Sequence, residues 1–260
     1  MARGAKLGQH FLKDAWAARA VARAALASPD EPILEIGPGK GILTKELLLI
    51  SKKVIAVEKD DELIPLLKEK FAEELANGTL TLIHTDIRDF KPQDAGLEAG
   101  KYILAANIPY YITGEIIRQF LTTAIYPRAM SLLVQKEVAM RSVDKKESIL
   151  SLSIKAYGTP RVAAKVPRRH FSPPPSVDSA VLCIENISKD FFKDFSEESF
   201  FAVVKAGFAA KRKMLANNLG EAFGKEKAIV AMEKAGIEPK SRAEDVHLAA
   251  WKMLAQHLTD

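Results

Sequence analysis

The stretch Ile33-Leu34-Glu35-Ile36-Gly37-Pro38-Gly39-Lys40-Gly41 decides the fold class of this 260-residue chain. Its first four residues are a short, mainly apolar run that ends in glycine, a pattern that predicts a buried strand. Residues 42–50 follow with leucines at helical spacing, which predicts a helix directly after the glycine-rich turn. A strand, a glycine-rich turn and a helix in this order indicate an α/β domain with a cofactor site at the turn.

Further apolar runs continue the alternation of strands and helices. Strands are predicted at 53–57, 79–84, 102–106 and 129–134. Between them, residues 113–123, and a segment with apolar side chains at 63, 67, 71 and 75, have the spacing of helices. We therefore predict a doubly wound, Rossmann-like α/β sheet that is mostly parallel and has helices on both faces.

The second half of the chain has a different pattern. Residues 148–157, 161–166 and 179–185 are predicted as three more strands, and the chain beyond Asn186 has helical patterns only. The interpretation is one domain over residues 1–186, which begins with a basic N-terminal arm, and a small all-helical domain over residues 187–260.

Composition and cysteine content exclude several classes of protein. Hydrophobic residues make up 48% of the chain and charged residues 27%, as in an ordinary globular protein, so a wholly disordered chain is excluded. No apolar run reaches the roughly 18–20 residues that span a bilayer. Cys183 is the only cysteine and the five histidines are scattered, which gives neither a disulfide nor the spacing of a metal site. We expect a cytoplasmic monomer with no metal and no membrane partner.

The distribution of charge points toward an anionic partner. The chain has 38 basic and 33 acidic residues, a net charge of +5. Residues 148–177 and 199–220 contain basic but no acidic side chains, as a phosphate-binding face requires. The basic residues of these stretches that we assign to nucleic acid are Arg168, Arg169, Lys211, Arg212 and Lys213. The alternative is that both stretches are solvated loops and helix ends, and charge alone leaves it open.

The glycine-rich turn fits a nucleoside cofactor without phosphates. A phosphate-binding Walker loop needs Gly-Lys-Ser/Thr at positions where this chain has Ile42, and the dinucleotide fingerprint needs a glycine there. Glycines 37 and 39 let a ligand approach the backbone closely. Glu58, at the end of the second strand, can accept hydrogen bonds from ribose hydroxyls, and Asp86, just after the third strand, can accept from an adenine amino group. Together they predict S-adenosylmethionine as the cofactor.

The segment Asn107-Ile108-Pro109-Tyr110-Tyr111 follows the fourth strand, so it lies at the sheet edge where such folds bind ligands. An exocyclic amine of a base is a poor nucleophile because its lone pair is delocalised into the ring. The Asn107 side-chain carbonyl and a backbone carbonyl near Ile108 can accept its two N–H bonds and direct the lone pair at a methyl donor. Tyr110 offers a face for an extruded base, and Pro109 fixes the backbone.

Several further motifs occur in the order found in one family. The chain resembles the ribosomal RNA adenine dimethyltransferase family, the kasugamycin-sensitivity enzymes, over nearly its whole length. The motifs that carry the resemblance are Gly8-Gln9-His10-Phe11-Leu12, Glu35-Ile36-Gly37-Pro38-Gly39, Glu58, Thr85-Asp86, Asn107-Ile108-Pro109-Tyr110, residues 133–138, residues 171–181, residues 208–219 and residues 242–245. His10 stands where the family often has Asn, and Ile108 where Leu is usual; neither change removes a required group.

The resemblance implies a fold, a reaction and a set of site residues. It implies a Rossmann-like methyltransferase domain followed by a helical RNA-docking domain. The family adds two methyl groups to each of two adjacent adenines near the 3′ end of small-subunit rRNA during ribosome biogenesis, on immature small subunits, and releases S-adenosylhomocysteine. The implied cofactor contacts are His10, Leu12, Gly37, Glu58, Asp86 and Asn107, and Gly39 joins them from the glycine turn. Asn107, Pro109 and Tyr110 would activate the amine, and Phe171 would stack on the other face of the target adenine.

Two alternative functions remain open from the sequence. One is a ribosome-assembly factor that binds nucleic acid on a methyltransferase fold without catalysis. The other is a DNA adenine methyltransferase, although such enzymes commonly have proline where this chain has Ile108. Outside the proposed sites, Trp16 and Trp251 are expected to be packing residues rather than base-stacking platforms, and Cys183 is expected to be a core thiol.

Overall fold

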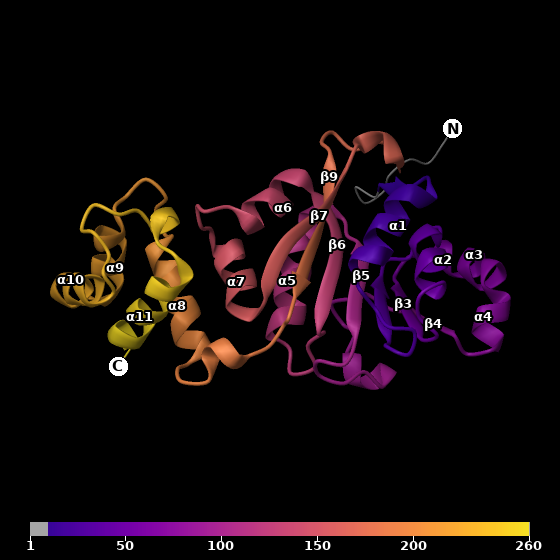
Figure 1. Cartoon of the computed structure of the whole chain (residues 1–260), viewed down its shortest axis with the longest axis horizontal. Helices are drawn as coiled ribbons and strands as arrows, with labels where there is room; N and C mark the ends of the chain where they lie inside the picture. The colour runs from indigo at the N-terminus through magenta and orange to yellow at the C-terminus, as the bar shows by residue number, and fades with distance from the viewer. Residues whose placement is uncertain (1–9, 260) are drawn as a thin grey trace. The chain divides into compact units, whose positions relative to one another are not determined.

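The computed structural model describes residues 10–259; residues 1–9, the predicted basic N-terminal arm, lie outside the described residues. A seven-stranded sheet with the strand order β4-β3-β2-β5-β6-β9-β7 dominates the first of two compact units (Figure 1). Its strands are β2 (Ile33–Ile36), β3 (Val54–Glu58), β4 (Leu80–His84), β5 (Ile103–Asn107), β6 (Ala129–Gln135), β7 (Thr159–Val166) and β9 (Ser179–Glu185). Four of the six strand pairings are parallel and the two made by β9, with β6 and with β7, are antiparallel, so the predicted mostly parallel sheet is confirmed.

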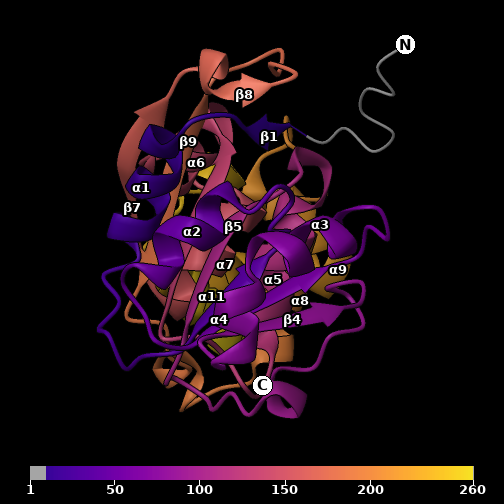
Figure 2. The ribbon, with the colours of Figure 1, turned by 90° about the vertical axis from the view of Figure 1, so that its right-hand side faces the viewer.

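Helices cover both faces of this sheet. On one face α1 (Ala15–Ala24) and α2 (Ile42–Leu48) pack against each other, as Figure 2 shows, and join one core cluster with the strands. Because successive residues of a strand point to opposite faces of the sheet, the strands also need a cover on the second face. The other face is covered by α5 (Thr113–Thr122), which lies across β6 from α1 in Figure 1 and buries four apolar side chains. The remaining helices up to residue 143 are α3 (Leu63–Lys70), α4 (Ala72–Ala76) and α6 (Lys136–Val143).

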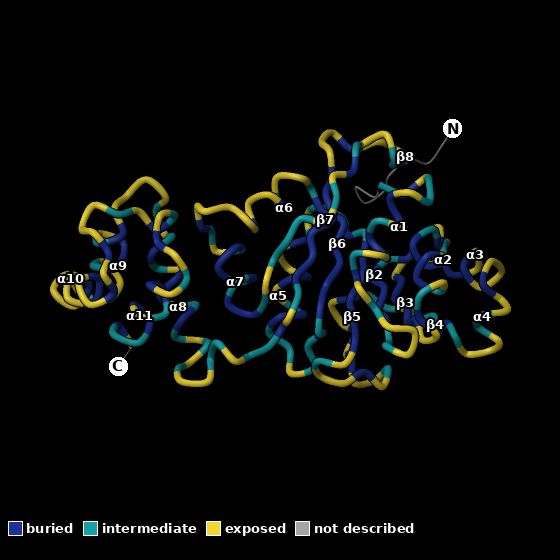
Figure 3. The backbone as a smooth tube through the Cα atoms, in the orientation of Figure 1, coloured by how far each residue is buried: buried dark blue, intermediate teal, exposed yellow. Residues whose placement is uncertain are grey.

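The central strands are apolar at successive positions because both of their faces are covered. Every residue of β2 and β3 is buried, and the centre of the sheet is dark blue in Figure 3. In a sheet of this kind a strand needs apolar side chains at adjacent rather than alternate positions. β4, at the edge of the sheet, has only its first residue, Leu80, buried. The prediction of a buried strand at 33–36 is therefore confirmed.

Phe71 divides what the sequence predicted as one helix. Its backbone lies at φ −116° and ψ 33°, so α3 ends before it and α4 begins after it. The ring of Phe71 fills the space beside Gly41: a Cβ atom on Gly41 would lie 2.4 Å from Cε2 of the ring. The contact packs the turn after β2 against the end of α3. The helix is therefore interrupted by a tertiary contact, which the periodicity of the sequence does not reveal.

Residues 148–157 are a helix, and the predicted strand there is wrong. α7 (Ile149–Tyr157) begins at Ser148, whose Oγ accepts the N–H of Ser151 at 3.1 Å. The alternation of apolar residues and serine from 150 to 154 imitates a strand, but the N-terminal cap at Ser148 is the stronger local signal. Near the end of α7, the ring of Tyr157 lies 5.0 Å from that of Phe192.

The second compact unit takes in residues 141–157 as well as 189–260, whereas the sequence analysis placed its start at residue 187. Residues 141–157 belong to it because Glu147 N–H donates to the Glu244 carbonyl at 2.7 Å and Lys146 pairs with the Glu244 carboxylate at 2.7 Å. Its other helices are α8 (Glu197–Gly207), α9 (Leu215–Phe223), α10 (Lys225–Lys234) and α11 (Leu248–Thr259). No helix within residues 10–259 is long and apolar enough to cross a membrane.

Strand order places a crevice between β2 and β5. From β2 the chain adds β3 and β4 on one side and then returns to add β5 on the other. Such a reversal leaves the carboxyl ends of the two strands uncovered by a crossing connection, and ligands of doubly wound folds bind there. The glycine-rich turn follows β2 and Asn107 ends β5, so both predicted motifs meet at this crevice.

We expect Gly41→Ala to lower the free energy of unfolding by roughly 2–5 kcal/mol, because the new methyl group meets the Phe71 ring and the backbone is left-handed at φ +71°. Gly78→Ala is the matched control: Gly78 has φ +79° but nothing within 4 Å of an added Cβ. Backbone strain alone should reduce its stability by about 1–2 kcal/mol. Urea unfolding followed by circular dichroism measures both, and equal losses would contradict the packing role of Phe71.

Candidate active site

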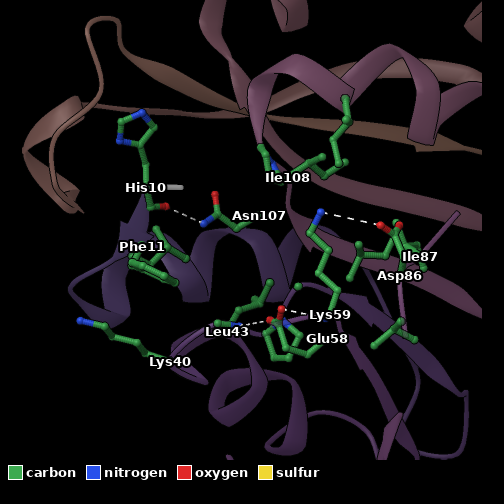
Figure 4. A pocket seen from close by; sticks show the side chains of 18 of the residues that line it. His10, Phe11, Lys40, Leu43, Glu58, Lys59, Asp86, Ile87, Asn107 and Ile108 are labelled. Atoms are coloured by element: carbon green, nitrogen blue, oxygen red, sulfur yellow. Dashed lines mark hydrogen bonds and ion pairs between the residues drawn. The ribbon is translucent and has the colours of Figure 1, made fainter. Parts of the chain in front are cut away.

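A cavity at the carboxyl ends of β2, β3, β4 and β5 gathers residues from five separate segments of the chain (Figure 4). All of the predicted cofactor contacts line it, and so do three of the four predicted catalytic residues, Asn107 being counted in both groups. These lining residues are His10, Leu12, Gly37, Gly39, Glu58, Asp86, Asn107, Pro109 and Tyr110. The predictions made from separate motifs thus converge on one site.

The glycine turn forms one wall of this cavity. Gly37 and Gly39 have φ values of +64° and +58°, a conformation that L side chains rarely adopt. A Cβ atom at Gly37 would meet nothing within 4 Å, whereas one at Gly39 would lie 3.0 Å from the ring of Phe11. Gly37 therefore leaves open space beside the backbone, and Gly39 allows the β1 segment to approach.

Glu58 ties this wall to the end of β3. Its Oε2 accepts the N–H of Gly39 at 3.1 Å, and its Oε1 accepts the N–H groups of Lys59 and Asp60 at 2.9 and 3.0 Å. The residue is only 5% exposed. Each carboxylate oxygen can accept more than one hydrogen bond, so a carboxylate fixed in this way still has acceptor capacity toward the cavity. The geometry suits a group that must receive hydroxyl donors at a set position.

Asp86 is held as a carboxylate by a bidentate ion pair. Arg88 donates to it through Nε at 3.0 Å and through a terminal nitrogen at 2.6 Å, and the Lys59 ammonium lies 3.7 Å away. Hydrogen bonds from the Arg88 guanidinium hold the pKa of Asp86 well below its usual range. Asp86 is thus an acceptor at neutral pH, as its predicted contact with an amino group requires.

Asn107 is oriented by the N-terminal segment. Its Nδ2 donates to the backbone carbonyl of His10 at 3.0 Å. Because a carbonyl only accepts hydrogen bonds, the amide nitrogen must face His10, and the Oδ1 atom is directed away from it, as Figure 4 shows. Asn107 therefore presents an acceptor to the cavity.

Pro109 and Tyr110 follow directly. Pro109 has φ −55° and ψ 131° and leads into a short 3-10 turn, Tyr110–Ile112. The Tyr110 hydroxyl lies 2.7 Å from Ser179 Oγ, and its ring centroid lies 5.8 Å from that of His10. Burial raises the pKa of Tyr110, so the hydroxyl stays neutral. The ring is held at both ends.

Phe171 lies elsewhere. It belongs to β8 (Phe171–Ser172), which pairs with β1 (Phe11–Leu12) as an antiparallel ribbon, with Leu12 opposite Phe171. Its side chain is 2% exposed and joins the core cluster of this unit, and it does not line the cavity. In this structure Phe171 offers no ring face to a base. The predicted stacking role requires an exposed ring, so Phe171 could take that role only if its ring left the core.

The predicted RNA-binding residues lie on both units. Arg168 and Arg169 are exposed in a 3-10 turn, Arg168–His170, of the first unit. Lys211, Arg212 and Lys213 are exposed in the second unit, in the loop between α8 and α9.

The loop after α8 is anchored from within the second unit. Asn218, which is buried, donates from Nδ2 to the carbonyls of Gly207 and Ala210 at 2.6 and 3.1 Å. The first bond occupies the last carbonyl of α8, which has no partner inside the helix, and the second fixes the loop at Ala210. On the surface, Lys213 forms an ion pair with Glu221 at 2.6 Å. The backbone of the loop that carries Lys211, Arg212 and Lys213 is therefore held in place by Asn218.

The sequence did not single out several residues that line the cavity. Phe11 lies against the glycine turn, and Lys59 and Arg88 surround Asp86. Their positions, directly after a strand or beside a motif residue, are the only signal that could have found them. Among residues 10–259 no cluster of His, Cys, Asp and Glu side chains has the proximity of a metal site.

Two of the three residues expected to pack are in the core. Trp251 is 0% exposed, with its ring stacked 5.5 Å from Phe208, and Cys183 is buried in β9. Trp16 is 46% exposed and lies outside the core, contrary to its expected packing role.

Comparison with known proteins identifies the family. The family described as ribosomal RNA adenine dimethylase matches residues 3–260. The chain belongs to this family. Among curated proteins named ribosomal RNA small subunit methyltransferase A, the one from Dehalococcoides mccartyi (strain ATCC BAA-2266 / KCTC 15142 / 195) is 39% identical over 98% of this chain and 88% of its own length. The one from Moorella thermoacetica is 37% identical over 96% of this chain and 91% of its own length.

Solved structures agree on the fold. The crystal structure of the 23S rRNA methyltransferase ErmE matches with a TM-score of 0.77 at 25% identity, over 96% of this chain and all of that one. A dimethyladenosine transferase from Plasmodium falciparum matches with a TM-score of 0.78 at 23% identity, over 94% and 96% of the two chains. The predicted family and methyltransferase fold are confirmed, and with them an enzyme of the rRNA adenine dimethylase class that uses a methyl donor.

Glu35 is a buried carboxyl group under the glycine turn. It is 0% exposed, and hydrogen bonding from Thr44 offsets only part of the cost of burying its charge. Burial, with a smaller effect from the negative charge of Glu58, raises the pKa of Glu35 to about 8 from an ordinary value of 4.5. Glu35 is thus a neutral acid in the folded protein at neutral pH.

We expect the pH dependence of stability to report this group. Between pH 4.5 and about 8 the folded chain retains a proton on Glu35 that the unfolded chain has released, so the free energy of unfolding falls as pH rises. Glu35→Gln should remove on the order of 2–4 kcal/mol of that fall between pH 5 and 8. Glu69→Gln, exposed on α3, controls for the loss of one carboxyl group. Urea unfolding at several pH values measures the slopes; parallel slopes for wild type and Glu35→Gln would contradict the buried neutral acid.

Proposed function

We propose that this chain transfers methyl groups from S-adenosylmethionine to the exocyclic N6 of two adjacent adenines near the 3′ end of small-subunit rRNA, two to each adenine, during ribosome biogenesis. The observation that carries the proposal is the Asn107 amide, with its nitrogen bonded to the His10 carbonyl and its oxygen left as an acceptor at the cavity. The curated relatives that carry the name of a small-subunit methyltransferase support the substrate.

The residues around the cavity fit a nucleoside cofactor. Glu58 would accept hydrogen bonds from the ribose hydroxyls, and Asp86 would accept from the adenine amino group. Gly37 leaves room for the cofactor beside the turn, and the apolar side chains Ile36 and Ile87 also line the cavity. His10, Leu12 and Gly39 complete the predicted contacts. S-adenosylmethionine supplies an electrophilic methyl carbon on a sulfonium ion when bound.

Asn107 and the peptide that follows it would activate the amine. The Oδ1 atom of Asn107 and the carbonyl of Ile108 accept the two N–H bonds of the exocyclic amine. These bonds would favour a pyramidal nitrogen, whose lone pair could then form a bond to the methyl carbon while the bond from that carbon to sulfur breaks, with S-adenosylhomocysteine as the leaving group. The methylated nitrogen is acidic and gives a proton to water, so no strong base is needed.

Tyr110 and Pro109 would hold the target base. Tyr110 supplies a flat face at the cavity, and its hydroxyl contact with Ser179 restricts the ring. Base–aromatic stacking contributes about 1–3 kcal/mol. Pro109 restricts the backbone so that the acceptors and the ring converge. Phe171 would join as the second stacking ring after a rearrangement that exposes it.

Basic residues on both units would bind the rRNA of an immature small subunit. Arg168 and Arg169 lie in the turn just before Phe171, and the loop with Lys211, Arg212 and Lys213 is held by Asn218. Exposed guanidinium and ammonium groups release counterions from phosphates on binding, which gives affinity without reading sequence.

The test is mass spectrometry of small-subunit rRNA after incubation of unmethylated subunits with the protein and S-adenosylmethionine. We expect N6,N6-dimethyladenosine at two adjacent positions near the 3′ end. Binding of subunits without any methyl transfer would favour the assembly-factor alternative. Preference for naked duplex DNA in a competition assay would favour a DNA adenine methyltransferase.

Asn107→Ala separates catalysis from binding. We expect methyl transfer to fall by about 10²–10³-fold, the usual effect of removing one oriented hydrogen-bonding group from a transition state. Subunit binding should stay within about threefold, because Asn107 is not part of the basic surface. Radiolabelled methyl incorporation and filter binding give the two readouts. Methyl transfer near the wild-type rate would rule out the acceptor role of Asn107.

A further inference from the structure

Trp16 is an exposed aromatic side chain on α1 that neither the core nor the cavity uses. It is 46% exposed, whereas Ala17, Ala18 and Val21 on the same helix are buried. One exposed apolar side chain needs no explanation by itself. The inference therefore depends on the groups around Trp16.

Trp16 is stacked on an imidazole that is itself fixed. The rings of Trp16 and His170 lie 4.9 Å apart at an interplanar angle of 28°. Asp14 holds both partners: its Oδ2 lies 2.6 Å from His170 Nδ1, and its Oδ1 accepts the N–H of Trp16 at 3.2 Å as the N-cap of α1. The Asp14 carboxylate thus fixes both the start of α1, which carries the Trp16 indole, and the His170 imidazole on which the indole is stacked. A surface ordered in advance loses little conformational entropy when a ligand binds.

Cations without ion-pair partners surround this stack. Arg168 and Arg169 precede His170 directly, Lys13 precedes Asp14, and all three are exposed. None of the three forms an ion pair within the part of the chain that the structure describes. An aromatic face next to free guanidinium and ammonium groups is the combination that single-stranded nucleic acid requires, with stacking for a base and charge for its phosphates.

The stack is continuous with the wall of the cavity. Leu12 and Phe171 face each other across the β1–β8 ribbon, and Lys13 N–H donates to the His170 carbonyl at 3.0 Å. His10, on the same segment, lines the cavity and holds Asn107. Figure 2 shows β1 and β8 together beside the start of α1. An RNA strand that places one base in the cavity must lay its neighbours on the adjacent surface, and this ribbon leads to the stack.

We propose that Trp16 and His170 form a stacking shelf for an unpaired base that flanks the target adenine in RNA. The inference rests on the proposed function for the identity of the RNA. What it adds is a binding position for a second base, outside the cavity. The free face of the indole binds the base, and Arg168, Arg169 and Lys13 bind the neighbouring phosphates.

Trp16→Ala tests the shelf. We expect the Kd for a labelled single-stranded oligo(A) RNA, measured by fluorescence anisotropy, to rise about 5- to 150-fold, the range for loss of one stacked base. The KM for unmethylated small subunits should rise in parallel, with kcat changed by less than about twofold and the Kd for S-adenosylmethionine unchanged. Trp16→Phe should stay within about threefold of wild type in all four quantities. Leu49→Ala is the control for removing an exposed apolar side chain, since Leu49 is 73% exposed and lines a separate hollow with Lys52 and Thr79.

Intrinsic fluorescence gives a second, independent readout. The chain has two tryptophans, and Trp251 is 0% exposed, so quenching by oligo(A) reports Trp16. Wild type should be quenched and Trp16→Phe should not, although both bind. Wild-type RNA affinity and KM for Trp16→Ala would overturn the shelf. A raised KM for subunits without any quenching by oligo(A) would assign the surface to a protein partner and also overturn it. If wild type transfers no methyl group, the proposed function fails, while oligo(A) affinity and quenching still test the shelf.

Discussion

The hydrogen bond from Asn107 Nδ2 to the His10 carbonyl is the constraint on which the chemistry of the site depends. It joins residues 97 positions apart in the sequence, at the end of β5 and just before β1. An amide side chain presents either a donor or an acceptor to a ligand, and only the fixed carbonyl on its other side decides which. The site has an acceptor at this position because the N-terminal segment passes beside it.

His10 can serve this purpose because it is itself anchored. Its Nδ1 lies 2.8 Å from the carbonyl of Pro173, and the next two residues pair with β8. The β1–β8 ribbon thus ties the beginning of the chain to the Phe171–Ser172 segment, and both to the end of β5. Two motifs that are 160 residues apart in the sequence are therefore parts of one structural unit around the cavity, which gives a physical reason why they occur together in one chain.

The sequence predicts those parts of the fold and of the candidate site that depend on a local pattern. The apolar run at β2, the glycine turn and the end of β5 are each set by neighbours in the chain, so strand positions and the cavity edge were predicted correctly. Residues 148–157 were misassigned because a period-two pattern outweighed the cap at Ser148. Phe171 and Trp16 were misplaced for a different reason. Burial of an aromatic ring depends on what packs over it, and strand pairing between β1 and β8 has no local signal.

The same ribbon explains why one of these two aromatic residues is buried and the other exposed. Leu12 lies opposite Phe171 in the antiparallel pair, and both side chains are buried in the same core cluster. Past Leu12 the chain turns at Asp14 into α1, and the cap that starts the helix also brings Trp16 over His170 on the outer side. The exposed ring of Trp16 and the buried ring of Phe171 thus both lie where the β1–β8 pairing places their segments. The same pairing fixes the segment that holds His10, and through the His10 carbonyl it also fixes the orientation of Asn107.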